Sequence, residues 1–223
     1  MSSDSATEDI MSATYRALCK HGYASVTMQD IAAESEKSKS ALHYHYERKH
    51  DLLCAFLDDL LASYTDRLDG VEGETAHDRL LGTIETVFEP TEDSPTREFK
   101  TAILEMKAQG PYDEAFRERL TKFDQVLRDH VEEILAAGVE DGEFRADLDV
   151  EATADFFATV FNGAQTRSVA IGRPVDRSRK HLEQYVESRV LAGDCDAVGE
   201  FDVDGEDDDP ERGNVGTSPE GSK

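Results

Sequence analysis

Apolar residues recur along this chain with the period of an α-helix. Between Ile10 and Leu18 they stand three and four positions apart, which places one apolar stripe on a first helix that Gly22 is expected to end. Later segments keep this period, and none alternates convincingly in the manner of a strand. The pattern predicts further helices over residues 49–64, 76–88, 97–109, 112–137, 150–171 and 175–192. The expected fold class is therefore all-α.

Two short helices are predicted between the first helix and the long one that begins near residue 49. Thr27 precedes an apolar-periodic stretch and Asp30 follows three positions later, so a capping box starts a helix that ends near Ser35. Ser38 is the next capping residue, and about two turns of helix run from Lys39 to Tyr46. Two short helices joined by a tight turn have the organisation of a helix-turn-helix, whose second helix lies in the major groove of DNA.

The outward positions predicted for this third helix carry side chains that suit a DNA groove. They are Lys39, Ser40, Ala41, His43, Tyr44 and His45. All except Ala41 donate hydrogen bonds, and the methyl group of Ala41 can meet a thymine methyl. His43, His45 and His50 are also potential metal ligands, but residues two apart on a helix point to different sides, so no metal site is predicted.

The stretch TMQDIAAESEKSKSALHYHYERKHDLL resembles the N-terminal signature of the tetracycline-repressor-like (TetR/AcrR) family. The matching residues are Thr27, Ile31, Ala32, Ser38, Leu42, His45, Lys49 and Leu52, whereas Glu36, Lys37, Ser40, His43 and Tyr46 depart from the signature. The resemblance implies a dimeric, ligand-responsive transcription regulator. It assigns phosphate contacts to Thr27, Ser38, Tyr44, His45 and Lys49, and base-edge contacts to Lys39, Ser40, Ala41 and His43. The chemistry agrees, because a helix start and a lysine both attract anions.

The net charge of −25 is unfavourable for binding DNA, because phosphate must be met by positive charge. Residues 1–50, however, contain six Lys/Arg and seven Asp/Glu, so almost all of the excess acid lies behind the head. Scarce lysine and abundant carboxylate indicate a protein adapted to molar salt, and a halophilic, archaeal source is expected. At an ionic strength of about 1 M the Debye length is about 3 Å, so distant acids hardly repel DNA.

Other features narrow the class of protein. No apolar run reaches the length of a membrane span and the N-terminus is polar, which predicts a cytoplasmic location. Cys19, Cys54 and Cys195 lack a metal-binding or CxxC spacing and are interpreted as reduced residues, the first two as packing residues. Neither a catalytic constellation nor a phosphate-binding glycine loop is visible, so neither an enzyme nor a cofactor is expected.

The helices behind the head are rich in aromatic residues. Most of these residues belong to a core, but the resemblance implies a pocket for a small apolar or amphipathic effector among them, which flexible Met106 would suit. The candidate pocket residues are Phe88, Ile103, Met106, Phe116, Phe123, Phe157, Phe161 and Gln165. Asn162, Gln165 and Glu105 are the candidates for its polar groups.

The last two helices carry more apolar residues than one face can hold, which predicts a homodimer interface. The residues assigned to it are Phe161, Leu182, Tyr185 and Val186. The sequence thus divides into a helix-turn-helix domain at 7–50, a helical effector-binding and dimerisation domain at 51–193, and an acidic disordered tail at 194–223. The preferred hypothesis is a repressor released from a roughly palindromic operator by its effector. The alternatives are a ligand-independent DNA-binding regulator and a helical protein-interaction module.

Overall fold

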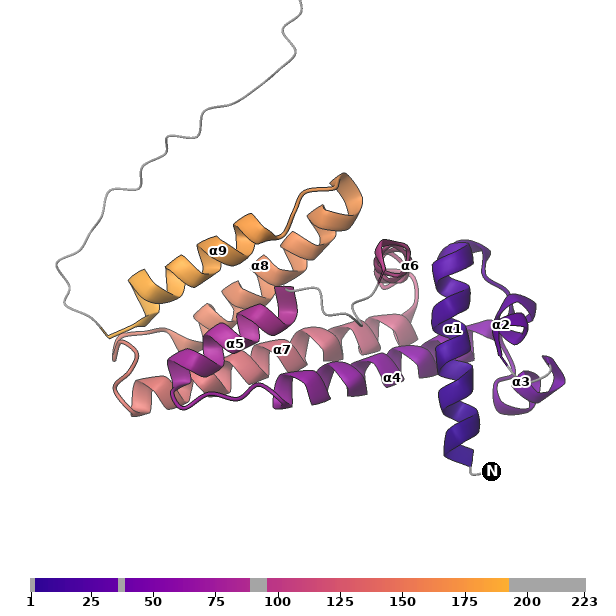
Figure 1. Cartoon of the computed structure of the whole chain (residues 1–223), viewed down its shortest axis with the longest axis horizontal. Helices are drawn as coiled ribbons and strands as arrows, with labels where there is room; N and C mark the ends of the chain where they lie inside the picture. Colours follow the sequence, from indigo (N-terminus) through magenta and orange to yellow (C-terminus); the bar gives the residue numbers. More distant parts are fainter. Residues whose placement is uncertain (1–2, 36–38, 89–95, 193–223) are drawn as a thin grey trace, which may run out of the picture. The chain divides into compact units, whose positions relative to one another are not determined.

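A computed structural model of the chain describes residues 3–35, 39–88 and 96–192, and Figure 1 shows the course of its helices. Within these ranges the chain forms nine α-helices, one π-helical turn and no named strand. Their bounds are α1 Ser3–Ser25, α2 Met28–Glu34, α3 Lys39–His45, α4 Lys49–Asp69, α5 Ala76–Phe88, α6 Arg97–Lys107, α7 Glu114–Glu140, α8 Val150–Ile171, α9 Asp176–Tyr185 and η1 Val186–Val190. The all-α prediction is confirmed, and none of these helices is long and apolar enough to cross a membrane. The tail predicted at 194–223 lies outside the described residues.

Gly22 interrupts α1 as the sequence predicts. Its backbone has φ 68° and ψ 170°, a conformation that residues with a Cβ rarely adopt. Before the bend, the stripe of Ile10, Ala13, Ala17 and Leu18 is fully buried. Gly22 therefore sets where the long first helix gives way to the chain that leads into α2.

The buried side chains form two clusters, and the first one joins the head to the body. It combines residues of α1 to α4 with Phe99, Ala102 and Met106 of α6 and with Phe116 of α7. In Figure 1, α1 stands between α2 and α6, and it packs against both. The head consequently shares its core with α6 instead of closing a core of its own.

The second cluster lies among α5, α7, α8 and α9. Within it, Gly138 does not end α7, as the sequence suggested, but lies inside the helix, which continues to Glu140. The ring of Phe144 occupies the space above it, and an ideal Cβ on Gly138 would stand 2.2 Å from Phe144 Cδ2. The chain turns only at Gly142, where φ is 75°. Gly138 is thus required by close packing.

The end of the body also differs from the prediction of one helix over 175–192. After α9 the chain widens into the π-helical turn η1, and Leu191 N donates to Val186 O at 3.1 Å. Phe144 and Leu191 then form an isolated antiparallel bridge. Arg145 N donates to Val190 O at 3.0 Å, and Ala192 N donates to Glu143 O at 2.8 Å. These backbone bonds hold the end of the body against the loop between α7 and α8.

Candidate nucleic-acid interface and ligand cavity

The start of α2 is fixed by a capping box. Thr27 Oγ1 accepts from Asp30 N at 3.2 Å, while Thr27 N donates to Asp30 Oδ2 at 2.9 Å. The hydroxyl of Thr27 also donates to Asp30 Oδ2 at 2.6 Å. The hydrogen bonds that Asp30 accepts from the hydroxyl and from the backbone N–H of Thr27 hold the pKa of Asp30 below its usual value, and the hydroxyl has the larger effect. Thr27 therefore acts as a cap, and its hydroxyl proton is already donated within the head.

The short helix α3 is held by one buried residue and presents its other side to solvent. Leu42 is fully buried in the core of the head. Ser40, His43, Tyr44 and His45 are exposed, and Tyr44 reaches 87% exposure. Ala41 is half-buried. An exposed tyrosine beside two exposed histidines on a helix anchored by a single leucine is a surface available to another molecule.

Two of the predicted DNA contacts belong to the start of the third helix. Ser38 lies outside the described residues, and Lys39 is placed only as the first residue of α3. Their assignment stays a prediction. It rests on the helix start, which the structure places where the capping pattern predicts it.

Lys49, predicted to contact a DNA phosphate, also binds Tyr23 within the protein. Its ammonium donates to Tyr23 O at 3.3 Å and lies 5.3 Å from the centre of the Tyr23 ring. Tyr23 N in turn donates to Glu105 Oε2 at 2.7 Å. The backbone of Tyr23, next to the bend at Gly22, is thus bound by a side chain of α4 and by one of α6. An ammonium has three donors, so Lys49 keeps hydrogen-bonding capacity for a phosphate.

The body contains a small apolar cavity of about 10 Å³, close to the space that one water molecule needs. Its walls are Thr83, Ile84, Val87, Phe88, Leu127, Val131, Phe157, Phe161 and Leu182. Phe88 and Phe161 meet edge to face, with ring centroids 5.7 Å apart. The hydroxyl of Thr83 already donates to Arg79 O at 2.8 Å, so the wall offers a ligand mainly hydrocarbon.

The structure brings together only part of the predicted effector pocket. Phe88, Phe157 and Phe161 line the cavity, and Gln165 lies nearby, where its Nε2 donates to Val87 O at 3.3 Å. The other four candidates, Ile103, Met106, Phe116 and Phe123, pack in or against the core shared with the head. The apolar period of a helix does not tell which of two cores a residue joins. The prediction from the sequence therefore placed residues of both cores in one pocket.

A polar network of Lys107, Asn162 and Asp124 joins α6, α8 and α7. Lys107 Nζ donates to Asn162 Oδ1 at 3.2 Å, and Asn162 Nδ2 donates to Asp124 Oδ1 at 3.0 Å. Burial lowers the pKa of Lys107, and the negative charge of Asp124 partly opposes this shift. The hydroxyl of Tyr64 is buried and makes no hydrogen bond within the described residues. Asn162 was a predicted polar group and Tyr64 belongs to the apolar set of the helix predicted over 49–64, whereas Lys107 carries no sequence signal of burial.

The residues predicted for a dimer interface have different surroundings. Leu182 and Val186 are buried within the protomer, and Phe161 lines the cavity. Tyr185 is half-buried, and its ring lies 5.0 Å from that of Phe156 between centroids. Leu182 and Val186 therefore have no free surface to offer a partner, and the outward side of α8 and α9 is made by other residues.

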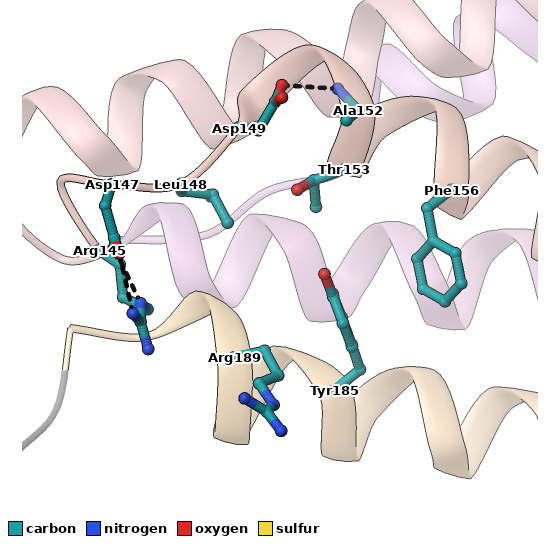
Figure 2. Close-up of a pocket in the computed structure, with 9 residues that line it drawn as sticks. All are labelled: Arg145, Asp147, Leu148, Asp149, Ala152, Thr153, Phe156, Tyr185 and Arg189. Carbon is teal, nitrogen blue, oxygen red and sulfur yellow. Dashed lines mark hydrogen bonds and ion pairs between the residues drawn. The ribbon is translucent and has the colours of Figure 1, made fainter. Parts of the chain in front are cut away.

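That outward side includes an open groove of about 530 Å³ between the start of α8 and the end of the body. Figure 2 shows Phe156 and Tyr185 at one end, Arg145 paired with Asp147 at the other, and the Tyr185 hydroxyl pointing toward Thr153. Phe156 is 42% exposed, and Ile171, at the end of the same helix, is 66% exposed. Gly163 of α8 is exposed, and an ideal Cβ there meets nothing within 4 Å.

Comparison with known proteins agrees with this architecture. Residues 10–56 match the family described as bacterial regulatory proteins, tetR family, and residues 76–191 match the C-terminal domain of BetI-type transcriptional repressors. A TetR transcription regulator from Haloarcula marismortui ATCC 43049 has a solved structure with 36% sequence identity and a TM-score of 0.79. That match covers 84% of this chain and 100% of the other.

Two further proteins are similar. The HTH-type transcriptional repressor AcnR of Corynebacterium glutamicum is 26% identical over 160 residues, which are 72% of this chain and 80% of AcnR. A transcriptional regulator from Saccharomonospora viridis, solved in complex with choline, shares the fold with 23% identity and a TM-score of 0.73, over 85% of this chain and 100% of that one.

The chain belongs to the TetR family of transcription regulators. It is a DNA-binding regulator with a helix-turn-helix head, and not an enzyme, as the sequence predicts. Regulators of this family bind DNA and act as dimers with small-molecule effectors. These matches contradict the alternative hypothesis of a helical protein-interaction module.

Proposed function

We propose that this regulator represses transcription from a roughly palindromic operator and leaves it when a small molecule binds in the body. The observation that carries the proposal is that one protomer combines an exposed α3 surface with an apolar cavity in its body. Repression is supported by relatives that are named as repressors. A protein that binds DNA works where the genome is, so we place it in the cytoplasm.

For the operator, we assign base-edge contacts to Lys39, Ser40, Ala41 and His43, and phosphate contacts to Thr27, Ser38, Tyr44, His45 and Lys49. The exposure of Ser40, His43, Tyr44 and His45 supports this division. The Thr27 hydroxyl would have to exchange its bond to Asp30 for one to a phosphate. Tyr44, His45 and Lys49 are therefore the stronger phosphate contacts among the described residues.

For the oligomer, a homodimer through the outward side of α8 and α9 is supported by exposed Phe156 and Ile171. A glycine inside an exposed helix costs about 1 kcal/mol relative to alanine, so Gly163 calls for a compensating role. Close approach of a second copy supplies one, because nothing within the described protomer covers that position. We assign dimerisation and effector binding to the domain at 51–193, DNA binding to 7–50, and neither to the tail at 194–223.

The small cavity also favours a second candidate, a regulator without an effector that responds to salt itself. A volume of about 10 Å³ holds no organic molecule until the surrounding side chains move. An effector-responsive regulator must therefore have a second, opened state of the body, which its ligand would favour. The alternative requires no such state.

Chromatin immunoprecipitation with the full-length protein identifies its operators, and fluorescence anisotropy then measures affinity for one of them. We expect binding that small molecules weaken about 5- to 150-fold, the usual range of allosteric coupling. Specific binding that salt alters but no compound in a broad metabolite library does would favour the second candidate. A failure to bind any genomic site above random DNA would refute operator recognition altogether.

A further inference from the structure

Lys107 of α6 is a partly buried cation without an ion pair. Its ammonium makes one hydrogen bond, to Asn162 Oδ1, and no carboxylate of the described residues comes within ion-pair distance. The carboxylate of Asp124 binds the opposite end of the same amide, so Asn162 separates the two charges. A charged group removed from water is costly unless an opposite charge or several hydrogen bonds stabilise it. The Lys107 ammonium therefore has unused donors and an unpaired charge with which to bind an anion.

Tyr64 of α4 supplies a second unused donor. Its hydroxyl oxygen is buried without a hydrogen-bond partner in the described part of the chain, and its ring packs on Phe123 with centroids 6.0 Å apart. Burial raises the pKa of this phenol, so it keeps its proton at neutral pH and can only gain by donating it. Buried polar groups in native proteins almost always have a partner, so an unpaired hydroxyl indicates a missing acceptor.

Both residues are linked to the helices that form the apolar cavity, and Asp124 of α7 is a neighbour of both, because its charge affects the pKa of Lys107 and that of Tyr64. Asn162, the partner of Lys107, follows Phe161, which lines the cavity. Phe123, the partner of Tyr64, lies one helical turn before Leu127, another lining residue. The polar groups, an ammonium among them, stand on α6 and α4, which pack against the helices α8 and α7 that carry part of the hydrocarbon wall.

We propose that the effector is a small organic acid with an apolar tail, whose carboxylate binds Lys107 and Tyr64 and whose tail enters the cavity lined by Phe88, Phe157 and Phe161. This inference rests on the proposed function and names the ligand class of the same site. A carboxylate accepts hydrogen bonds and carries the charge that Lys107 lacks, while an alkyl or aryl tail satisfies the apolar wall. A quaternary ammonium ligand, such as the choline bound by the Saccharomonospora viridis regulator, would bring a second cation beside Lys107.

The same helix connects this site to the head. Glu105 stands two positions before Lys107 on α6 and accepts from the backbone of Tyr23, beside the bend in α1. A carboxylate that shifts α6 through Lys107 would also move Glu105, because both residues belong to one helix. Loss of the Glu105 bond would leave the backbone of Tyr23 held by Lys49 alone among these two side chains.

The test compares three ligands that share one tail on the full-length protein. A series of straight-chain carboxylates of increasing length is titrated by isothermal calorimetry, together with the matching primary alcohols and the matching trimethylammonium salts. We expect the best carboxylate to bind at least about 10-fold more tightly than its alcohol, as a hydrogen bond to a charged group requires. The ammonium salt should bind most weakly.

Variants locate the effect. Lys107→Met should weaken carboxylate binding about 10- to 100-fold and alcohol binding by a much smaller factor, because only the carboxylate carries a charge. Tyr64→Phe should weaken the carboxylate by a smaller factor. The matched control is Lys122→Met, which removes an exposed lysine from the neighbouring helix α7 and should change nothing. Circular dichroism and the melting temperature of each variant establish that it is folded.

Preference for the ammonium salt or the alcohol would overturn the proposal, and so would an absence of carboxylate binding at every chain length. A Lys107→Met variant that is folded and binds the carboxylate normally would overturn it as well. Operator binding is measured separately by anisotropy with the same preparations. Intact operator binding with no carboxylate response refutes only the ligand class, whereas loss of operator binding by the wild-type protein refutes the proposed function.

Discussion

Phe144 lies directly against the backbone of α7 at Gly138, so the packing there tolerates no added atom. We expect Gly138→Ala to destabilise the protein by about 1 to 3 kcal/mol, the usual cost of overpacking, although alanine is the better helix former. Thermal unfolding at fixed salt measures this. The double variant Gly138→Ala/Phe144→Leu should recover part of the loss, because the added methyl group then has space. Equal stability of Gly138→Ala and wild type would contradict this account.

Lys107 should reduce the stability of the protein without ligand. Burial lowers the pKa of its ammonium in the folded state, so folding becomes easier as the pH rises through that lowered pKa toward the pKa of the unfolded chain. Lys107→Met should therefore stabilise the protein near pH 7, by about 1 kcal/mol, and the gain should shrink at higher pH. Melting temperatures measured from neutral to alkaline pH provide the test. A destabilised variant would show that the bond to Asn162 dominates.

The sequence could not distinguish these single residues from their neighbours. A lysine within a helix is ordinarily a surface residue, and only the packing of α8 and α7 around it reveals that Lys107 is partly buried. Gly138 was expected to end α7 because glycine usually weakens a helix. The contact with Phe144 depends on a turn that follows α7, which the helical period does not encode.

Among the elements, α2, α5 and α8 were predicted with the greatest accuracy because local chemistry sets their ends, and α5 spans Ala76–Phe88 as predicted. Thr27 and Asp30 form the expected capping box, and α8 spans Val150–Ile171 as predicted. The predicted helix over 175–192 failed in its last part, where the chain forms η1. The backbone bonds between Arg145 and Val190 and between Ala192 and Glu143 shape that end, and such long-range pairing leaves no local pattern.

The element α3 and the first residue of α4 give separable predictions on DNA. Lys49→Ala should weaken operator and random DNA equally and reduce the salt slope of log K by about one, because one phosphate contact is lost. Lys39→Ala should cost about 1 to 3 kcal/mol on the operator, far less on random DNA, and relax base preference at one position of each half-site. Anisotropy titrations at several fixed salt concentrations measure both.

Because Lys49 also binds Tyr23 O, its variant needs a control for stability. Tyr44→Phe offers one, since this exposed residue on α3 loses only a hydroxyl. It should weaken both DNAs to a similar degree without lowering the melting temperature. If Lys39→Ala and Lys49→Ala reduce both affinities equally, the division into base and phosphate contacts is wrong.

For the whole molecule, the structure changes which residues should test the homodimer. A charge at Phe161 would enter the cavity and unfold the body instead of separating two copies. Phe156→Asp and Gly163→Arg place charges on the outward side of α8 and should convert a dimer into a monomer. Ser63→Arg, at an exposed position of α4, is the matched control. Sedimentation velocity in high salt distinguishes the two states, and a wild-type monomer at every concentration would disprove the dimer.

The two-residue spacing of Glu105 and Lys107 on α6 also bears on how sensitive a promoter is. A link between two binding sites is reciprocal, so an effector that weakens operator binding must itself be bound more weakly, by the same factor, when the operator is occupied. DNA therefore acts as a competitor of the effector although the two never touch. A cell with many operator copies would need a higher effector concentration to induce its genes than a cell with one. The dose at which transcription responds would then be a property of the genome as much as of the protein.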